Sequence, residues 1–235
     1  MKSVFSSIIA LLRRLPYLGR GRFCPICECE SRRFRKAGLI ARDDARCIYC
    51  GSLERHRFVW LYFQRRTNLF NGMWLRVLHI APEPCLEARL KSRLGTGYLT
   101  ADLVDPQVMV KMDVTDISYP DESFDVIYCS HVLEHVVDDR KAMKEFYRIL
   151  KRGGWAILLV PIMAKATFED PAIVDPAQRL KIFGQSDHVR IYGPDYVDRL
   201  REAGFSVKIS KVEDVVERSD AVRMGLTDAS GNIYF

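Results

Sequence analysis

Residues Phe124–Pro161, FDVIYCSHVLEHVVDDRKAMKEFYRILKRGGWAILLVP, decide the fold of this chain. The stretch opens with an apolar run of strand type over 124–129 and closes with a second one over 155–160. Apolar residues between the two runs recur at helical spacing: Ala142, Phe146, Ile149 and Leu150. Gly153-Gly154 follow a basic last turn, as is typical of a helix C-terminus. The order of strand, helix and strand, with both strands apolar throughout, predicts a βαβ unit in a parallel sheet with helices on both faces.

Three pieces of this stretch resemble, in their order, motifs IV to VI of the class I S-adenosylmethionine-dependent methyltransferases of type 11. The pieces are FDVIYCSHVLEHV, then EFYRILKRGGW, then the strand that runs into Pro161. The resemblance covers about residues 72–210. It implies a Rossmann-like α/β fold, S-adenosylmethionine as cofactor, and ligand binding at the carboxyl ends of the strands.

The charge of the chain is unevenly distributed. Residues 1–66 hold 15 Lys and Arg against 5 Asp and Glu, a net +10, whereas residues 67–235 hold 21 against 25, a net −4. A basic N-terminal third indicates either a contact with an anionic partner, such as RNA or a membrane surface, or simply a solvated basic face.

Four of the seven cysteines form two C-x-x-C pairs, Cys24-Pro-Ile-Cys27 and Cys47-Ile-Tyr-Cys50, which 19 residues separate. The odd total and the paired spacing argue against a disulfide framework and favour a reducing compartment. Each pair can present two thiolates to one ion, so the pattern predicts a zinc ribbon over residues 21–52. Four protein ligands fill the shell of Zn²⁺, and we therefore expect a structural ion there rather than a catalytic one.

The remaining segments follow from apolar periodicity. Residues 1–20 are expected to hold an amphipathic helix that lies on a lipid surface or packs against protein. A linker helix is expected over 53–71 and the methyltransferase domain over 72–235. The sequence holds no run long enough for a transmembrane segment, and no small-residue cleavage site follows the apolar N-terminus. We therefore expect a cytoplasmic protein, with peripheral attachment to the membrane left open.

The segment after the first expected strand, 74–80, departs from the family pattern. Class I methyltransferases usually end this strand with an acid and a glycine-rich turn. In this chain His79 stands where the acid is expected, and Ala81, Glu83 and Cys85 replace the three glycines. We infer that Glu83 supplies a carboxylate to the cofactor's amino group from a displaced position. The alternative is that this turn no longer binds cofactor.

The other expected cofactor contacts match the family. Asp102 ends the second expected strand, 23 residues after His79, near the spacing at which a carboxylate takes the ribose hydroxyls. Asp113 follows the third strand at the position that holds the adenine amino group in the family, and Val114 is expected against the adenine ring. The expected cofactor site also includes two neighbouring residues: Leu103 and Ser130.

Residues 161–190 are expected to form a substrate loop or lid, because insertions of this length are usually functional. His188 is predicted to be the general base for an acceptor hydroxyl, with Asp187 orienting it. Arg190 and Tyr192 are predicted to bind substrate. The alternative is that Asp187 and His188 only cap the helix that follows.

The segment HVLEHV carries two more histidines. His131 is expected to face cofactor or substrate and is a third catalytic candidate, whereas His135 is expected to be a helix or capping residue. Glu134 and His135 are not interpreted as a metalloprotease motif, because the order H-x-x-E-H is reversed and no third ligand is apparent.

Taken together, these patterns predict a methyltransferase that uses S-adenosylmethionine on a small-molecule or glycan-like acceptor and carries a structural Zn²⁺. Two alternatives stay open. One is an RNA methyltransferase that is guided by the zinc ribbon. The other is a non-catalytic zinc-ribbon binding protein with a degenerate cofactor domain, which the Ala81–Cys85 turn favours.

Overall fold

The computed structural model describes residues 15–38 and 41–235, so most of the predicted N-terminal helix lies outside the described residues. These residues form two compact units. The first unit comprises the described residues up to Asn71 together with 84–89 and 211–230, and the second comprises 72–83, 90–210 and 231–235. In the described ranges, no helix combines the length and the apolar content needed to cross a bilayer.

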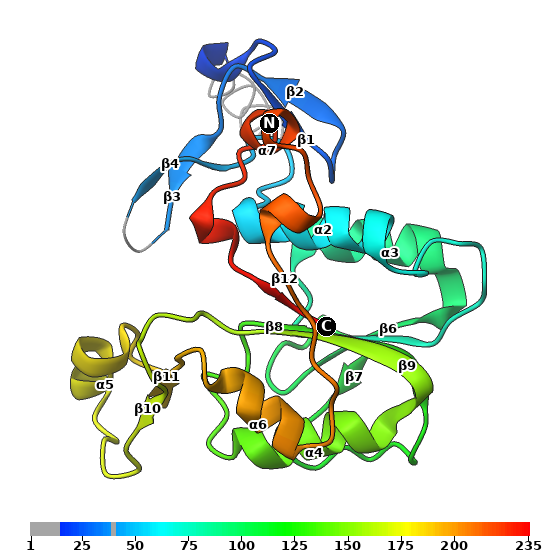
Figure 1. The fold of residues 1–235 in the computed structure, drawn as a ribbon, viewed down its shortest axis with the longest axis vertical. Coiled ribbons are helices and arrows are strands. Elements are labelled where there is room, and N and C mark those ends of the chain that lie inside the picture. The colour runs from blue at the N-terminus through cyan, green and yellow to red at the C-terminus, as the bar shows by residue number, and fades with distance from the viewer. Residues whose placement is uncertain (1–14, 39–40) are drawn as a thin grey trace, which may run out of the picture. The chain divides into compact units, whose positions relative to one another are not determined.

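The second unit is built on a five-stranded parallel sheet with the order β7-β6-β5-β8-β9 (Figure 1). Its strands are β5 Val77–Ile80, β6 Tyr98–Asp102, β7 Val110–Lys111, β8 Phe124–Ser130 and β9 Leu150–Leu159. The chain places its first strand, β5, in the centre, then builds outward to β7, and returns to add β8 and β9 on the other side. The predicted Rossmann-like parallel sheet is confirmed, and its switch point lies between β5 and β8.

Helices of the second unit cover one face of this sheet. Asp138 caps α4, Asp139–Ile149, because its Oδ1 accepts a hydrogen bond from the backbone amide of Lys141 at 2.9 Å. Helix α6, Tyr196–Glu202, packs beside α4 (Figure 1), and an ion pair between Arg140 and Glu202 joins the two helices. The inward face of α4 is fully buried at four residues: Ala142, Met143, Phe146 and Ile149.

Strand β9 begins earlier than the sequence predicts. Leu150 already pairs with Phe124, so the strand includes Gly153-Gly154 instead of starting after them. Gly153 has a φ of +74°, and a Cβ on Gly154 would lie 2.8 Å from the carbonyl oxygen of Asp125. These two glycines therefore form an irregularity inside a strand, not the end of a helix.

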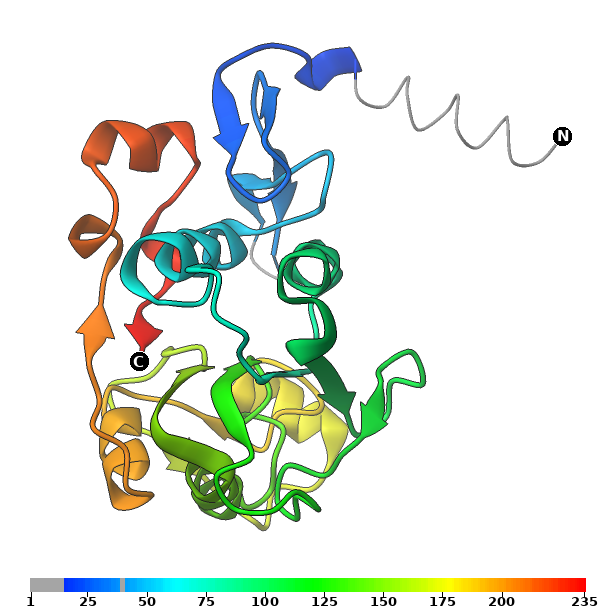
Figure 2. The same ribbon diagram turned by 90° about the vertical axis from the view of Figure 1, so that its right-hand side faces the viewer.

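The insertion after β9 is folded. Strand β10, Phe168–Glu169, pairs antiparallel with β11, Arg190–Ile191, and α5, Pro176–Phe183, lies between them in sequence. Strands β12, Ile209–Ser210, and β13, Ile233–Tyr234, form a second antiparallel pair (Figure 2). The helical segments that follow β5 are α3, Pro84–Leu94, and the 3-10 turn η2, Gly95–Gly97.

The first unit combines two hairpins with helix α2, Glu54–Arg66, and the segment 211–230. The hairpin strands are β1 Arg22–Cys24, β2 Cys29–Ser31, β3 Arg35–Ala37 and β4 Arg42–Arg46. The helical segments at its two ends are η1 Leu15–Tyr17, η3 Val212–Asp214, α7 Arg218–Arg223 and η4 Asp228–Ser230. The sequence-based assignment of residues 72–235 to one domain thus differs from the structure, in which 211–230 join the cysteine-bearing unit.

A buried arginine contributes to holding this discontinuous unit together. The Arg57 side chain on α2 is fully buried, and its guanidinium lies 4.3 Å from the ring centroid of Phe34. Its nitrogens donate hydrogen bonds of 2.7–3.0 Å to four backbone carbonyls: Ala45, Ser52, Met224 and Gly225. The guanidinium therefore connects the β4 hairpin, the second cysteine turn and the C-terminal segment.

Candidate functional site

A pocket of about 700 Å³ opens at the carboxyl ends of β5, β6 and β8, next to the switch point of the sheet. Seven residues of the predicted site line it: Ala81, Asp102, Leu103, Asp113, Val114, His131 and Asp187. Six other predicted residues do not: His79, Glu83, Ser130, His188, Arg190 and Tyr192. Pockets of roughly 300–1,000 Å³ are usual for small ligands, so the volume fits a nucleoside-sized cofactor with part of an acceptor.

Two strained residues shape the pocket wall. Ala81 follows β5 with a φ of +48°, and His131 follows β8 with a φ of +58°. Their backbone amides donate hydrogen bonds of 2.8 Å to the carbonyls of Ala101 and Leu159, respectively, which fixes both turns. A left-handed conformation costs a non-glycine residue about 1–2 kcal/mol, and such strain gathers at ligand sites. Ala81 thus makes the sharp turn for which the family uses glycine.

Two carboxylates stand on the same wall. Oδ1 of Asp102 accepts hydrogen bonds from the backbone amides of Val104 and Asp105 at 2.7 and 2.9 Å. Oδ1 of Asp113 accepts from the amide and the hydroxyl of Thr115, both at 2.8 Å. These two bonds lower the pKa of Asp113, so this exposed carboxylate is ionised at neutral pH.

Beneath the pocket wall, His79 belongs to a buried network. Nδ1 of His79 lies 2.7 Å from the hydroxyl of Tyr98, and Nε2 lies 2.9 Å from Oε2 of Glu83. Tyr128 donates its hydroxyl to Oε1 of Glu83 at 3.1 Å. A carboxylate only accepts, so Nε2 of His79 carries a proton and donates it to Glu83. The network fixes Glu83 at the start of the turn that follows Ala81.

The predicted catalytic residues are distributed differently from the expectation. His131 lines the pocket, and its Nδ1 lies 3.3 Å from Oε1 of Glu134. His188 is 97% buried, and Asp187 contacts Nδ1 of His135 at 3.3 Å, not the His188 ring. HVLEHV is a turn that precedes α4, so His135 is neither a helix residue nor its cap. Of the predicted catalytic histidines, His131 is the one on the pocket wall.

Arg190 and Tyr192, predicted to bind substrate, are both buried. The guanidinium of Arg190 donates hydrogen bonds to the carbonyls of Leu133, Val136 and Val137. The first two belong to the HVLEHV turn, and Val137 is the residue that follows it. The Tyr192 hydroxyl donates to Asp139 at 2.5 Å. In this geometry both side chains hold the turn in place, and neither presents a polar group to the pocket.

Sequence reasoning missed two groups of residues. Tyr98 and Tyr128 complete the His79 network, yet each lies inside an apolar strand run and carries no signal of its own. Asp139 of α4, Glu169 of the insertion and Arg199 of α6 form an ion network with bonds of 2.9–3.0 Å, and these charges are far apart in sequence. The early acidic position of Asp139 in α4 was visible, but its partners were not.

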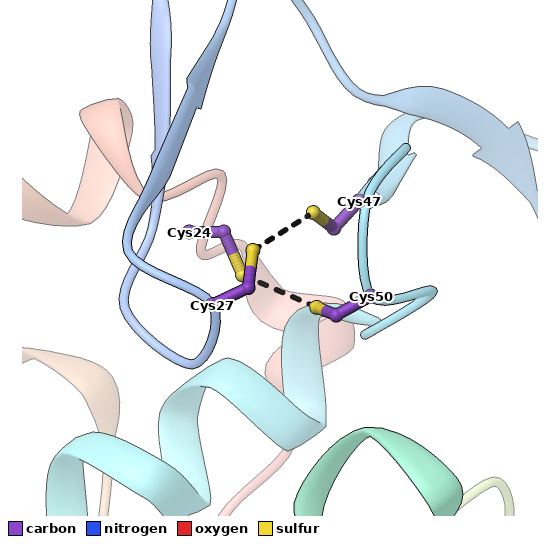
Figure 3. A group of neighbouring side chains, drawn as sticks. All are labelled: Cys24, Cys27, Cys47 and Cys50. Atoms are coloured by element: carbon purple, nitrogen blue, oxygen red, sulfur yellow. Dashed lines mark hydrogen bonds between the residues drawn. The ribbon is translucent and has the colours of Figure 1, made fainter. Parts of the chain in front are cut away.

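In the first unit, the four paired cysteines converge (Figure 3). The Sγ atoms of Cys24 and Cys50 lie 3.6 Å apart, and those of Cys27 and Cys47 lie 3.7 Å apart. A tetrahedral Zn²⁺ with bonds of about 2.3 Å would place its sulfurs about 3.8 Å apart, so the four thiols fit such an ion.

Both cysteine turns share one local geometry. The amide of the residue after the second cysteine donates to the carbonyl of the first, from Glu28 to Cys24 and from Gly51 to Cys47. Glu28 and Gly51 each have a positive φ, 60° and 75°. Neighbouring thiols lower the pKa of Cys24 and raise that of Cys27, so the four cannot all ionise without a cation beside them.

Comparison with known proteins gives a match to one family over part of the chain. Residues 74–158 match the Methyltransf_11 family, whose description is "Methyltransferase domain". The chain is 38% identical over 74 residues to the uncharacterized methyltransferase YcgJ of Bacillus subtilis, which covers 32% of this chain and 28% of that protein. It is 30% identical over 119 residues to the 27-O-demethylrifamycin SV methyltransferase of Amycolatopsis mediterranei, covering 49% of this chain and 40% of that protein.

Among solved structures, that of B. subtilis YcgJ is similar with a TM-score of 0.48 and 18% identity, over 74% of this chain and 80% of YcgJ. The matched residues and the strand order are those of the Rossmann-like fold of the class I S-adenosylmethionine-dependent methyltransferases. The family match covers 85 of the 235 residues of the chain. The chain spans less than half the length of the curated relatives it matches.

Proposed function

We propose that this protein transfers the methyl group of S-adenosylmethionine to a small-molecule or glycan-like acceptor. The observation that carries the proposal is that Asp102 and Asp113 face one pocket of about 700 Å³ at the switch point of the sheet. When bound, S-adenosylmethionine supplies a methyl group on a sulfonium, which an acceptor can attack in line.

The pocket wall offers a contact for each part of the cofactor. Asp102 would accept hydrogen bonds from the ribose hydroxyls, and Asp113 would accept one from the adenine amino group. Val114, which is 93% buried, offers an apolar surface to the adenine ring. Leu103, an exposed pocket residue, extends the apolar part of the same wall. Glu83 stays our candidate for the cofactor's amino group, although it does not line the pocket in this structure.

His131 is the best-placed group for acid–base chemistry. Its ring is one-third exposed, lines the pocket, and is oriented through Nδ1 by the buried carboxylate of Glu134. This arrangement leaves Nε2 to accept the proton of an acceptor hydroxyl. The remaining catalysis would come from alignment of acceptor and methyl group at near-attack distance. We therefore favour His131 over the buried His188 as the base.

The acceptor class is inferred from two observations. The rifamycin relative is named for a small-molecule acceptor, and the pocket has the volume of a small-ligand site. The basic N-terminal third gives less support to RNA or an anionic membrane than its net charge suggests. Several of its cations are already paired or buried, among them Arg22 with Asp44, Arg42 with Glu54, and Arg57.

We also propose that Cys24, Cys27, Cys47 and Cys50 hold one structural Zn²⁺. The sulfur separations and the two matching turns support it. Four thiolate ligands complete the shell of Zn²⁺, so the ion would stabilise the first unit and take no part in methyl transfer.

A labelling experiment tests the proposed function. The full chain is incubated with methyl-labelled S-adenosylmethionine in three separate reactions. One contains hydroxylated small molecules, one contains glycans, and one contains total RNA. Label is expected in a small-molecule or glycan fraction and is expected to vanish in the Asp102→Ala variant. Label in RNA alone would favour the ribbon-guided alternative, and cofactor binding without transfer to any fraction would favour a non-catalytic protein.

A further inference from the structure

Two buried polar atoms beside the pocket have no hydrogen-bond partner within the described residues. They are Oε2 of Glu134 and Nε2 of His188, on side chains that are 1% and 3% exposed. An unsatisfied buried polar atom costs about 1–3 kcal/mol, and native structures hold few of them. Two such atoms on neighbouring segments therefore need an explanation.

A third donor group completes the cluster. The His135 ring meets the His188 ring edge to face, with centroids 4.7 Å apart. The potential ligand atoms of Glu134, His135 and His188 all lie within 4.8 Å of one another. Two imidazoles and one carboxylate are the donor set that divalent transition metals take in sites with open positions. This third ligand could not be seen in the sequence, because His188 lies 53 residues after His135.

The surroundings orient each of the three groups. Asp187 holds Nδ1 of His135 at 3.3 Å, which leaves Nε2 for a ligand. The backbone of Phe183 hydrogen bonds the His188 ring, and since Nε2 of that ring is unpaired, the bond engages Nδ1. His131 contacts Oε1 of Glu134, which leaves Oε2. Histidines that bind metals are typically fixed through the second ring nitrogen in this way.

The backbone holds the two segments together before any ion binds. The Val189 amide donates to the Glu134 carbonyl at 2.9 Å, and Arg190 binds carbonyls of the same turn. With bonds of about 2.1 Å, a tetrahedral ion needs its ligand atoms about 3.4 Å apart. The ligand atoms lie within 4.8 Å of one another, so they have to approach by at most about 1.4 Å, which rotation about the χ angles of the side chains provides.

We propose that Glu134, His135 and His188 form a binding site for a divalent transition-metal ion, separate from the four-cysteine site. His135 lines the pocket, so the open coordination position of the ion would face it and could take an acceptor oxygen. Binding of the ion does not depend on methyl transfer, whereas its role in holding an acceptor oxygen rests on the proposed function.

The first test counts metal. The full chain is equilibrated with Zn²⁺, desalted and analysed for zinc. Two ions per chain are expected in the wild type and one in His188→Ala and Glu134→Gln, whereas the matched control His56→Ala should keep two. Asp187→Asn should weaken the second site by about 10–100-fold without abolishing it. One ion in the wild type, or two in both His188→Ala and Glu134→Gln, would overturn the proposal.

A second measurement serves if these variants fail to fold. Co²⁺ is titrated into the wild-type full chain, because cobalt bound by thiolates gives sulfur-to-metal charge-transfer absorption and cobalt bound by histidine and carboxylate does not. A second equivalent with d–d bands but no added charge transfer is expected. If every bound Co²⁺ shows thiolate charge transfer, the histidine site does not exist. Neither readout uses the methyl donor or an acceptor, so failure of this proposal is distinct from failure of the proposed function.

Discussion

Nε2 of His79 lies 2.9 Å from Oε2 of Glu83, and this contact links the centre of the sheet to the turn that lacks the family's glycines. Tyr98 and Tyr128 complete the network on either side. Where the family has an acid near the end of this strand, this chain has His79, which contacts a carboxyl group four residues later. A carboxyl group is thus present at this turn, but it comes from Glu83.

Glu83→Gln tests the role of this carboxyl group. The substitution keeps the shape of the side chain but removes its charge, so S-adenosylmethionine should bind about 10–100-fold more weakly if this carboxylate takes the cofactor's amino group. Tyr128→Phe is the matched control, because it removes one hydrogen bond to Glu83 and leaves the charge. Equal affinities of the wild type and Glu83→Gln, measured by calorimetry, would exclude Glu83 from the cofactor site.

His131→Asn should lower kcat by about 10²–10⁴-fold for a hydroxyl acceptor, since the proton of the attacking group loses its base. The affinity for S-adenosylmethionine should change little. The measurement is steady-state turnover together with a cofactor titration, with His56→Asn in the other unit as control. Turnover at the wild-type level in His131→Asn would remove this residue as the base.

Arg57→Met should destabilise the first unit by on the order of 3–5 kcal/mol, because four backbone carbonyls lose a charged donor in a buried place. Arg33→Met, at an exposed position of the same unit, should stay within about 0.5 kcal/mol. The loss should appear as a lower urea midpoint and as faster release of zinc to a chelator. Similar midpoints for the two variants would contradict the account of Arg57.

The charge of Glu169 should make the stability of the folded protein fall at low pH. Burial alone would raise the pKa of Glu169, but hydrogen bonds from Arg199 and Arg190 bring it below its usual 4.5. A lowered folded-state pKa stabilises the protein above about pH 4.5, and this stabilisation is lost as the pH falls through the folded value. Because Glu169 is partly exposed, solvent screening limits the effect to about 1 kcal/mol.

The corresponding experiment compares urea unfolding of the wild type and Glu169→Gln between pH 7 and pH 3. The wild type should be the more stable protein at neutral pH, and the difference should shrink below pH 4.5. A difference that stays constant over this range would show that the charge of Glu169 is not its source.

The sequence predicted the sheet well for a simple physical reason. A strand such as β8, buried at six of seven positions, reads as an unbroken apolar run that few other structures explain. The predicted start of β9 was wrong because glycine is common both at helix ends and at strand irregularities, so Gly153-Gly154 fit either one. The pairing of Leu150 with Phe124 shows that they lie within the strand. Local chemistry also found the four cysteines, since each turn is complete within five residues.

Contacts between distant segments could not be predicted from the sequence. Residues 211–230 join the cysteine-bearing unit through contacts such as those of Arg57, whose acceptors Met224 and Gly225 lie far along the chain. Arg190 looked like a substrate ligand because a charge on an insertion suggests an exposed site. The structure uses it instead for the carbonyls of the HVLEHV turn, which have no sequence signature.

The most direct test of the central claim is a calorimetric titration of S-adenosylmethionine into the folded, zinc-loaded full chain, with Asp102→Ala beside it. We predict micromolar binding to the wild type and a loss of at least tenfold in the variant, because the ribose hydroxyls would lose their carboxylate. No heat of binding with the wild type would contradict the account and would identify the second unit as a methyltransferase fold without its cofactor.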